Sequence, residues 1–197
     1  MAIFAKVVLS DTYNLPVYVR IMRRKIFLRK CVKSVDIFAG MSIIKIGKEG
    51  DPLMKIWFDM DGTIADLYAV TDWLPSIIAR DTRPYEIAQG IGNLALIARL
   101  LNAVQKNGHE IGIISWGAKN AENWYNTAVE TAKREWLAKH LKSVKWNEIK
   151  VVAYGTDKLT ATGGGILFDD EKPNRDNWGK GAYEPCEIIA VLKGLTK

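Results

Sequence analysis

Short apolar runs alternate with longer stretches of helical pattern from residue 55 onward, and this alternation restricts the fold more than any other feature. Four runs have the length and composition of buried strands, with a candidate fifth at residues 181–183: 55–59, 111–114, 149–153 and 166–168. Strands that alternate with helices at this spacing form parallel sheets with right-handed crossovers. We therefore predict an α/β fold with a parallel sheet for residues 54–197.

Two helical patterns follow the first strand. Residues 66–80 predict a short helical insert, which extends as a small cap to about residue 83. Pro84 suits the first turn of a helix, because the N–H that proline lacks would be unpaired there. We expect this helix to continue to about Asn107, although Gly90 and Gly92 weaken its first half.

Two further helices are expected in the second half of the chain. Residues 120–141 predict a long helix, and residues 185–195 predict the last helix of the chain. Four-residue steps assign the buried face of the long helix to Trp124, Ala128, Ala132 and Trp136. Its charged residues, Lys133 and Arg134 among them, are expected to face solvent.

Acidic and hydroxyl residues stand at the ends of three of the predicted strands. Asp59 and Asp61 follow the first, Ser115 follows the second, and Asp169 and Asp170 follow the fourth. In parallel sheets, ligands bind at the carboxyl ends of the strands. We therefore expect these side chains to meet at one edge of the sheet, where Lys158 supplies a cation.

These residue types suit the transfer of a phosphoryl group. Asp59 can be the nucleophile that forms an aspartyl-phosphate, and Asp61 can be the general acid and then the general base. The spacing of two places both carboxylates on one side of the chain. Lys158 can offset charge in the transition state. The candidate phosphate-binding positions are Gly62, Thr63, Ser115, Trp116 and Lys158.

A hard cation is expected beside the carboxylates. Mg²⁺ in proteins is typically held by one or two carboxylates and several waters. Asp59 with one of Asp169 and Asp170 meets that requirement, and Asp61 is a further candidate. Adjacent carboxylates repel each other unless a cation offsets their charge. The sequence therefore predicts a magnesium site.

The run Asp59-Met60-Asp61-Gly62-Thr63, with Ser115, Lys158 and Asp169-Asp170, resembles the four motifs of the haloacid dehalogenase superfamily. The resemblance covers residues 55–195. It implies a Rossmann-like three-layer core, Mg²⁺ dependence and an aspartyl-phosphate intermediate. It also implies a phosphatase rather than a dehalogenase, because the second acid, Asp61, is present, and it favours Asp170 as the direct metal ligand.

A narrower resemblance links the chain to 5′(3′)-deoxyribonucleotidases. It rests on Ala65-Asp66 after the first motif, and on residues 169–174 followed by Asn177-Trp178. It implies a nucleoside monophosphate or another small phosphomonoester as substrate. The insert at 66–83 is shorter than the cap of those nucleotidases, which suggests an open site. Three tryptophans could stack on a base, although core packing is the more common role: Trp73, Trp116 and Trp178.

Three alternatives to a nucleotidase stay open. An open site could admit a nucleic-acid 3′-phosphate end, which the basic N-terminal segment would favour. It could also admit a phosphoprotein. The chain could instead be a non-catalytic module that binds a phosphate ligand.

The net charge of +6 lies entirely in the N-terminal quarter. Residues 1–53 hold ten Lys and Arg against four Asp and Glu, and the remainder is balanced. This segment is either a basic N-terminal extension, for which a disordered tail is one alternative, or upstream sequence that precedes a translation start at Met54. Cys31 and Cys186 are too few for a disulfide framework or a zinc site. With no apolar run of the ~20 residues that a membrane helix needs, we expect no membrane partner and a cytoplasmic protein.

Overall fold

The computed structural model describes residues 53–196. The described residues belong to one compact unit. The two interpretations of residues 1–53 therefore concern a segment that lies, except for Leu53, outside the described residues. Within residues 53–196, no helix combines the length and apolar character needed to cross a membrane.

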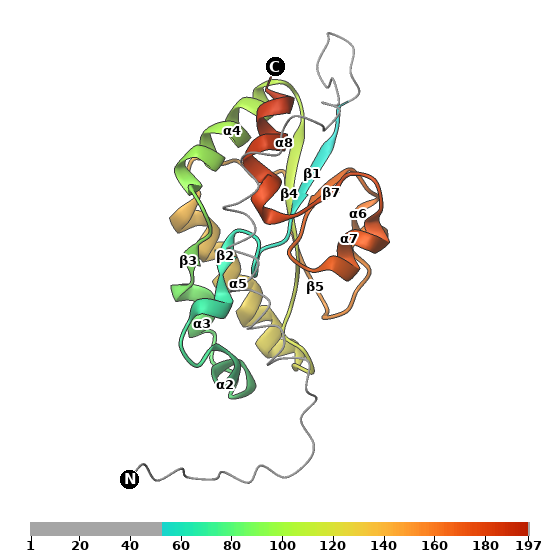
Figure 1. The fold of residues 1–197 in the computed structure, drawn as a ribbon. Helices are drawn as coiled ribbons and strands as arrows, with labels where there is room; N and C mark the ends of the chain where they lie inside the picture. The colour runs from blue at the N-terminus through green and yellow to red at the C-terminus, as the bar shows by residue number, and fades with distance from the viewer. Residues whose placement is uncertain (1–52, 197) are drawn as a thin grey trace, which may run out of the picture. The chain divides into compact units, whose positions relative to one another are not determined.

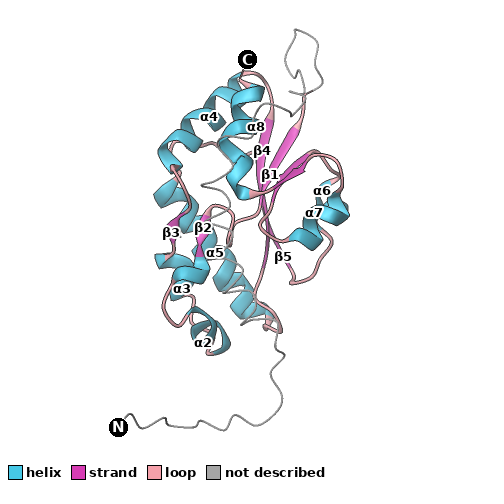
Figure 2. Ribbon diagram, viewed as in Figure 1, coloured by secondary structure: helices cyan, strands magenta, loops and turns pink. Residues whose placement is uncertain are grey.

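Five parallel strands form the central sheet, in the order β5-β4-β1-β6-β7 (Figures 1 and 2). The strands are β1 (Lys55–Phe58), β4 (Glu110–Trp116), β5 (Glu148–Val152), β6 (Ile166–Phe168) and β7 (Ala182–Tyr183). All five lie at the predicted places. The chain adds β4 and β5 on one side of β1, then β6 and β7 on the other, so the direction reverses at β1. Such a switch point leaves a crevice at the carboxyl ends of the neighbouring strands.

Helices cover both faces of the sheet and give three layers. One layer holds α4 (Leu94–Lys106), α5 (Asn123–His140) and α8 (Ile188–Leu195). Their buried side chains share one core cluster with Ile56 and Phe58 of β1. Trp57 points to the opposite face, where α6 (Lys158–Thr162) and α7 (Lys172–Trp178) pack. The side chains on both faces of β1 are therefore buried. The structure shows the predicted α/β class, with a Rossmann-like three-layer arrangement.

A small two-stranded sheet joins the two ends of the insert between β1 and α4. It holds β2 (Ala65–Asp66), the 3-10 helix η2 (Leu67–Ala69), α2 (Trp73–Ile78), α3 (Arg83–Ile87) and β3 (Gln89–Gly90). β2 and β3 pair antiparallel, with Ala65 opposite Gly90. The insert therefore runs to Gly90 rather than ending near residue 83. Tyr85 and Leu67 bury against Tyr125 and Val129 of α5.

Two helix predictions need correction. The single helix expected from Pro84 to Asn107 is two helices, because β3 and a turn at Gly92, with a φ of 71°, separate α3 from α4. Asn93 caps α4 by accepting a hydrogen bond from the backbone N–H of Leu96. In α5 the predicted buried face is confirmed at Ala132 and Trp136, is only partly buried at Ala128 and is wrong at Trp124. Trp124 is 62% exposed, whereas Tyr125 and Val129 are fully buried.

Gly165, at the start of β6, permits the close approach of two backbones. Its φ is 113°, and a Cβ atom there would collide with the carbonyl oxygen of Lys55. We expect Gly165→Ala to lower the free energy of unfolding by about 3 kcal/mol, because strain and a backbone clash add. Gly194→Ala is the matched control, since a Cβ there meets open space within α8. It should be neutral or stabilising by up to about 1 kcal/mol. Urea unfolding of both variants tests this, and equal stabilities would contradict the packing described.

Candidate functional site

The strand order brings the predicted site residues together. β4, β1 and β6 are neighbours in the sheet, so Ser115, Asp59 and Asp169 lie at adjacent carboxyl ends. The backbone N–H of Asp59 donates to the carbonyl oxygen of Phe168 at 2.8 Å, which extends the β1–β6 pairing to the site. Asp59, Ser115 and Asp169 are all buried. Three of the predicted segments therefore converge at the crevice beside β1.

Lys158 joins two of the carboxylates. Its buried Nζ donates to Oδ1 of Asp59 at 2.8 Å and to Oδ2 of Asp169 at 2.7 Å. Lys158 is the first residue of α6, and Asp157 caps that helix by accepting from the backbone N–H groups of Leu159 and Thr160. The cap fixes the start of the helix and so the direction of Lys158. Sequence analysis placed this cation correctly beside Asp59.

Lys133 is a second buried cation, and the prediction that it faces solvent is wrong. Its Nζ is fully buried and donates to Oδ2 of Asp61 at 2.8 Å, to Oγ of Ser115 at 2.9 Å and to the carbonyl oxygen of Trp116 at 2.7 Å. The ring of Tyr85 lies 5.3 Å from the same ammonium. The sequence does carry a signal for this position, because Lys133 is four residues from Val129 and eight from Tyr125.

Asp59, Asp169 and Asp170 form an acidic cluster that fits a metal ion. One carboxylate oxygen from each lies within 4.8 Å of the other two. Oδ1 of Asp170 is buried and has no hydrogen-bond partner among the described residues. A buried carboxylate oxygen without a partner is costly unless a cation binds it. The cluster therefore suits a hard cation such as Mg²⁺, with Asp170 supplying an uncommitted ligand atom.

The carboxylate of Asp61 is not part of this cluster. It is bound to Lys133 and is 18% exposed. Asp169, in contrast, has both oxygens engaged, since it accepts from Lys158, from the backbone N–H of Glu171 and from Nδ2 of Asn174. Of the two adjacent acids, Asp170 has the freer oxygen. This geometry favours the same residue that the family resemblance favours.

Burial and mutual repulsion raise the pKa values of the acidic residues. Burial and the charge of Asp59 raise the pKa of Asp169 to about 6, against the opposing effect of Lys158. Burial and the charges of Asp59 and Asp169 raise the pKa of Asp170 well above its ordinary value. Burial raises the pKa of Asp61 as well, with Lys133 opposing the shift. Four carboxylates face two lysines here, so a divalent cation would balance the charge when all are ionised.

Gly62 and Thr63 shape the turn that follows Asp61. Gly62 has a φ of 83°, and a Cβ atom there would collide with the side chains of Asp170 and Tyr68. The N–H of Gly62 donates to the carbonyl oxygen of Ala65, and Oγ1 of Thr63 accepts from the N–H of Asp170. In this structure both residues hold the turn against the acidic cluster.

The three candidate stacking tryptophans lie in different surroundings. Trp178 is in the core, where its indole N–H donates to the carbonyl oxygen of Gly165. Trp73 packs edge-on against Tyr68 in the insert. Trp116 is half-buried at the site, with its ring centroid 5.0 Å from Nζ of Lys158. Only Trp116 of these three touches the described site residues.

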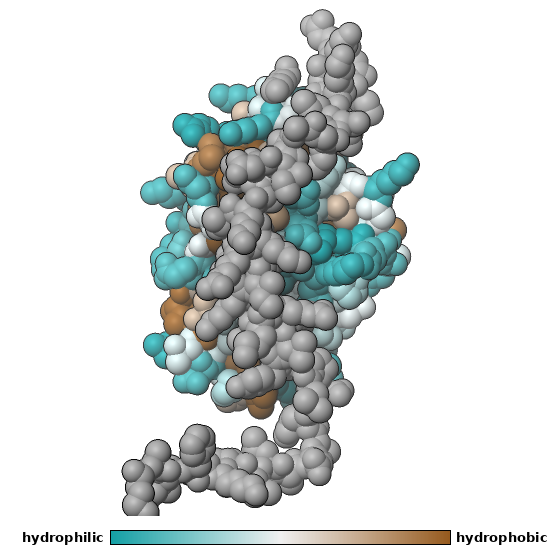
Figure 3. Space-filling model, viewed as in Figure 1, coloured by the Kyte–Doolittle hydropathy of each residue, from teal (hydrophilic) through white to brown (hydrophobic). Residues whose placement is uncertain are grey.

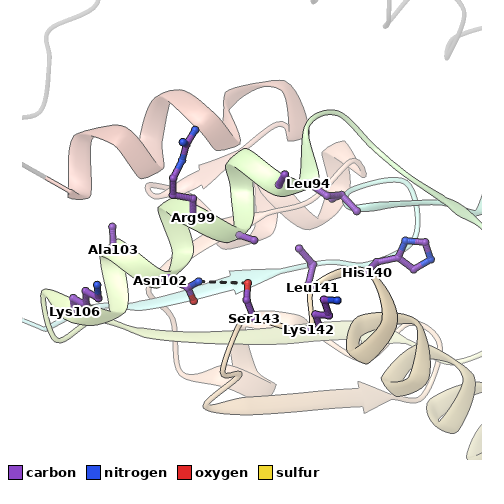
Figure 4. Close-up of a pocket in the computed structure, with 11 residues that line it drawn as sticks. Leu94, Arg99, Asn102, Ala103, Lys106, His140, Leu141, Lys142 and Ser143 are labelled. Atoms are coloured by element: carbon purple, nitrogen blue, oxygen red, sulfur yellow. Dashed lines mark hydrogen bonds between the residues drawn. The ribbon is translucent and has the colours of Figure 1, made fainter.

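A hollow of about 620 Å³ lies away from the site. It is a groove between α4 and the segment that ends α5, lined by Leu94, Arg99, His140 and Lys142 among others (Figure 4). Figure 3 shows hydrophobic residues over α4 and mainly hydrophilic ones over α6 and α7. None of the acidic cluster lines the groove, so the candidate chemistry lies elsewhere, at the carboxyl edge of the sheet.

No protein-family model matches the sequence, and neither the curated proteins nor the solved structures that were searched gave a match. The family resemblance therefore rests on the motif residues themselves. The geometry of Asp59, Asp61 and the acidic cluster is the remaining guide to function.

Magnesium should stabilise the folded chain through the acidic cluster. A ligand present at 100 times its dissociation constant stabilises by about 2.7 kcal/mol, which for a chain of this size raises Tm by about 5–10 °C. We expect this rise with Mg²⁺ and its loss on addition of EDTA. Asp170→Asn should weaken Mg²⁺ binding and so reduce the rise, while increasing Tm without metal, because repulsion among the acids falls. Asp176→Asn, at an exposed carboxylate, is the control that should keep the full rise.

Lys133 and Arg134 offer a matched test of the buried cation. Lys133→Met leaves Asp61 and Ser115 without their shared donor, and we expect a loss of about 3 kcal/mol in the free energy of unfolding. Arg134→Met removes an exposed pair with Glu130 and should cost less than about 1 kcal/mol. Chemical denaturation measures both. Equal, small losses would show that Lys133 is solvated after all.

Proposed function

We propose that the chain is a Mg²⁺-dependent phosphomonoester hydrolase of the haloacid dehalogenase type, acting through an aspartyl-phosphate. The observation that carries the proposal is the arrangement at the end of β1. Asp59 and Asp61 lie two residues apart, each bound to its own lysine, with Asp170 beside them holding an unpaired oxygen. A carboxylate nucleophile, a second acid and a cation-binding cluster are the components that this chemistry requires.

Asp59 is the proposed nucleophile. Its Oδ1 is held by Lys158, which fixes the carboxylate and reduces its repulsion of a phosphate dianion. A carboxylate oxygen of Asp59 forms the bond to phosphorus as the bond from phosphorus to the ester oxygen breaks. The aspartyl-phosphate is the product of this first step.

Asp61 is the proposed acid and base. It donates its proton to the departing ester oxygen in the first step. In the second step it takes a proton from the water that attacks phosphorus, which releases inorganic phosphate and restores Asp59. Lys133 holds one oxygen of Asp61 in place, and Ser115, on the same lysine, lies ready to donate to a phosphoryl oxygen.

Asp59, Asp169 and Asp170 would hold the metal ion. When bound, Mg²⁺ neutralises charge on the phosphoryl oxygens and orients the group for in-line attack. Lys158 contacts two of these three acids and so limits how far they separate without metal. The proposed substrates are nucleoside monophosphates or other small phosphomonoesters, as the narrower resemblance implies.

Replacing the nucleophile separates catalysis from binding. We expect Asp59→Asn to reduce kcat for phosphate release by at least about 10³-fold, since no carboxylate remains to form the intermediate. Binding of inorganic phosphate with Mg²⁺, measured by calorimetry, should persist in the variant. The full chain would be assayed on nucleoside monophosphates, sugar phosphates and 3′-phosphorylated oligonucleotides, with Mg²⁺ and with EDTA.

Asp72→Asn is the matched control, because Asp72 is exposed and its φ of 56° suits asparagine. It should keep wild-type turnover. Phosphate binding by the wild-type chain without release from any ester would instead identify a binding module, and would overturn the proposed hydrolase.

A further inference from the structure

A row of aromatic and cationic side chains leads outward from Lys158. The ring centroid of Trp116 lies 5.0 Å from Nζ of Lys158, and the ring of Tyr154 lies 5.0 Å from that of Trp116. Nζ of Lys119 then lies 5.5 Å from the centroid of Tyr154. The row begins at a group bound to Asp59 and ends at two exposed residues, since Tyr154 is 44% exposed and Lys119 is exposed.

Hydrogen bonds hold the inner part of the row in place. The indole N–H of Trp116 donates to the carbonyl oxygen of Thr156 at 2.8 Å, which ties the end of β4 to the loop that carries Tyr154. Nδ2 of Asn177 donates to Asp157 at 2.7 Å and anchors the other end of that loop to α7. The inner part of the row is therefore held in place before any ligand binds, which reduces the entropic cost of binding.

The exposed end of the row has no role in the proposed chemistry. Tyr154 and Lys119 bind none of the four carboxylates of the site. Tyr154 packs against Trp116, the residue that follows Ser115, and Lys119 packs against Tyr154. An exposed tyrosine ring offers a stacking face for a planar group. An exposed lysine offers a charge to a phosphate. Together they suit a ligand with an aromatic ring and a second anionic group.

The spacing selects among aromatic phosphomonoesters. In an aryl phosphate the ring is bonded directly to the ester oxygen, so it would lie against the phosphoryl site itself. The ring of Trp116 connects Nζ of Lys158 to the ring of Tyr154, and its centroid lies 5.0 Å from Nζ and 5.0 Å from the centroid of Tyr154. A ring that stacks there needs a spacer between itself and phosphorus, and the sugar of a nucleotide supplies one.

We propose that Trp116, Tyr154 and Lys119 form a subsite that extends the range of substrates beyond small phosphomonoesters to the phosphorylated end of a single-stranded oligonucleotide, with the terminal base on Tyr154 and the next phosphate at Lys119. The inference rests on the proposed function, because the terminal phosphate must sit beside Asp59. The Lys119 side chain is exposed and its contact with the Tyr154 ring is a weak one. The Lys119 side chain can move off the ring when a base stacks there, and its ammonium group then remains close to the next phosphate.

Binding of a phosphorylated trinucleotide with a fluorescent label at its far end tests the subsite. Anisotropy is measured in the full chain carrying Asp59→Asn, with Mg²⁺, so that the proposed hydrolysis does not consume the probe. Added Tyr154→Leu should weaken binding about tenfold, and should leave unchanged the affinity for a probe whose terminal nucleotide lacks a base. Added Lys119→Met should reduce the slope of log K against log salt by about 0.7. Lys106→Met, at an exposed lysine of α4, should change neither quantity.

Turnover of the same trinucleotide by the wild-type chain is measured in parallel, which separates the two proposals. Binding weakened by both substitutions supports the subsite, even if the wild-type chain releases no phosphate and the hydrolase is wrong. Binding that is absent, or equal in all variants, overturns the subsite, even if phosphate is released. Loss of binding to the base-free probe in Tyr154→Leu would also overturn it, because that loss indicates a distorted loop.

Discussion

The pairing of buried carboxylates with buried lysines is the constraint on which this edge of the structure depends. Asp59 and Asp169 share Lys158, and Asp61 shares Lys133 with Ser115. A buried charge without its partner costs several kcal/mol, so each lysine must arrive from a helix whose position is fixed. The cap at Asp157 fixes one, and the packing of α5 under the insert fixes the other. Asp170 is left with an unpaired oxygen, where a cation fits.

The insert contributes to the site through packing. The ring centroid of Tyr85, a residue of α3, lies 5.3 Å from Nζ of Lys133, a residue of α5. Tyr68 of η2 lies against Gly62, and its burial, together with the charges of Asp170, Asp61 and Asp59, raises the pKa of its hydroxyl well above the ordinary value. The short insert is therefore joined to the proposed acid, Asp61, through Lys133. A change within α3 should reach the chemistry by way of that lysine.

The strands and the motif residues at their ends could be predicted from the sequence, because buried parallel strands are short, continuous apolar runs. The position of Lys158 beside Asp59 could also be predicted, because this lysine belongs to the ordered set of motifs. Lys133 was missed although its spacing from Val129 and Tyr125 places it on the buried face of α5, because a lysine is ordinarily expected on an exposed face and the position of Asp61, which makes its burial favourable, cannot be read from that spacing. The break between α3 and α4 was also missed. The β2–β3 pair that causes it has two residues in each strand, too few to leave a pattern.

The central claim is that Asp59 itself receives the phosphoryl group, and chemical trapping tests it most directly. Borohydride reduces an acyl phosphate to an alcohol, so an aspartyl-phosphate becomes homoserine. The account predicts homoserine at position 59, identified by peptide mass spectrometry, when the chain is quenched during turnover with Mg²⁺. No such residue should form with EDTA. Phosphate release with Asp59 unmodified, or homoserine at another aspartate, would contradict the account.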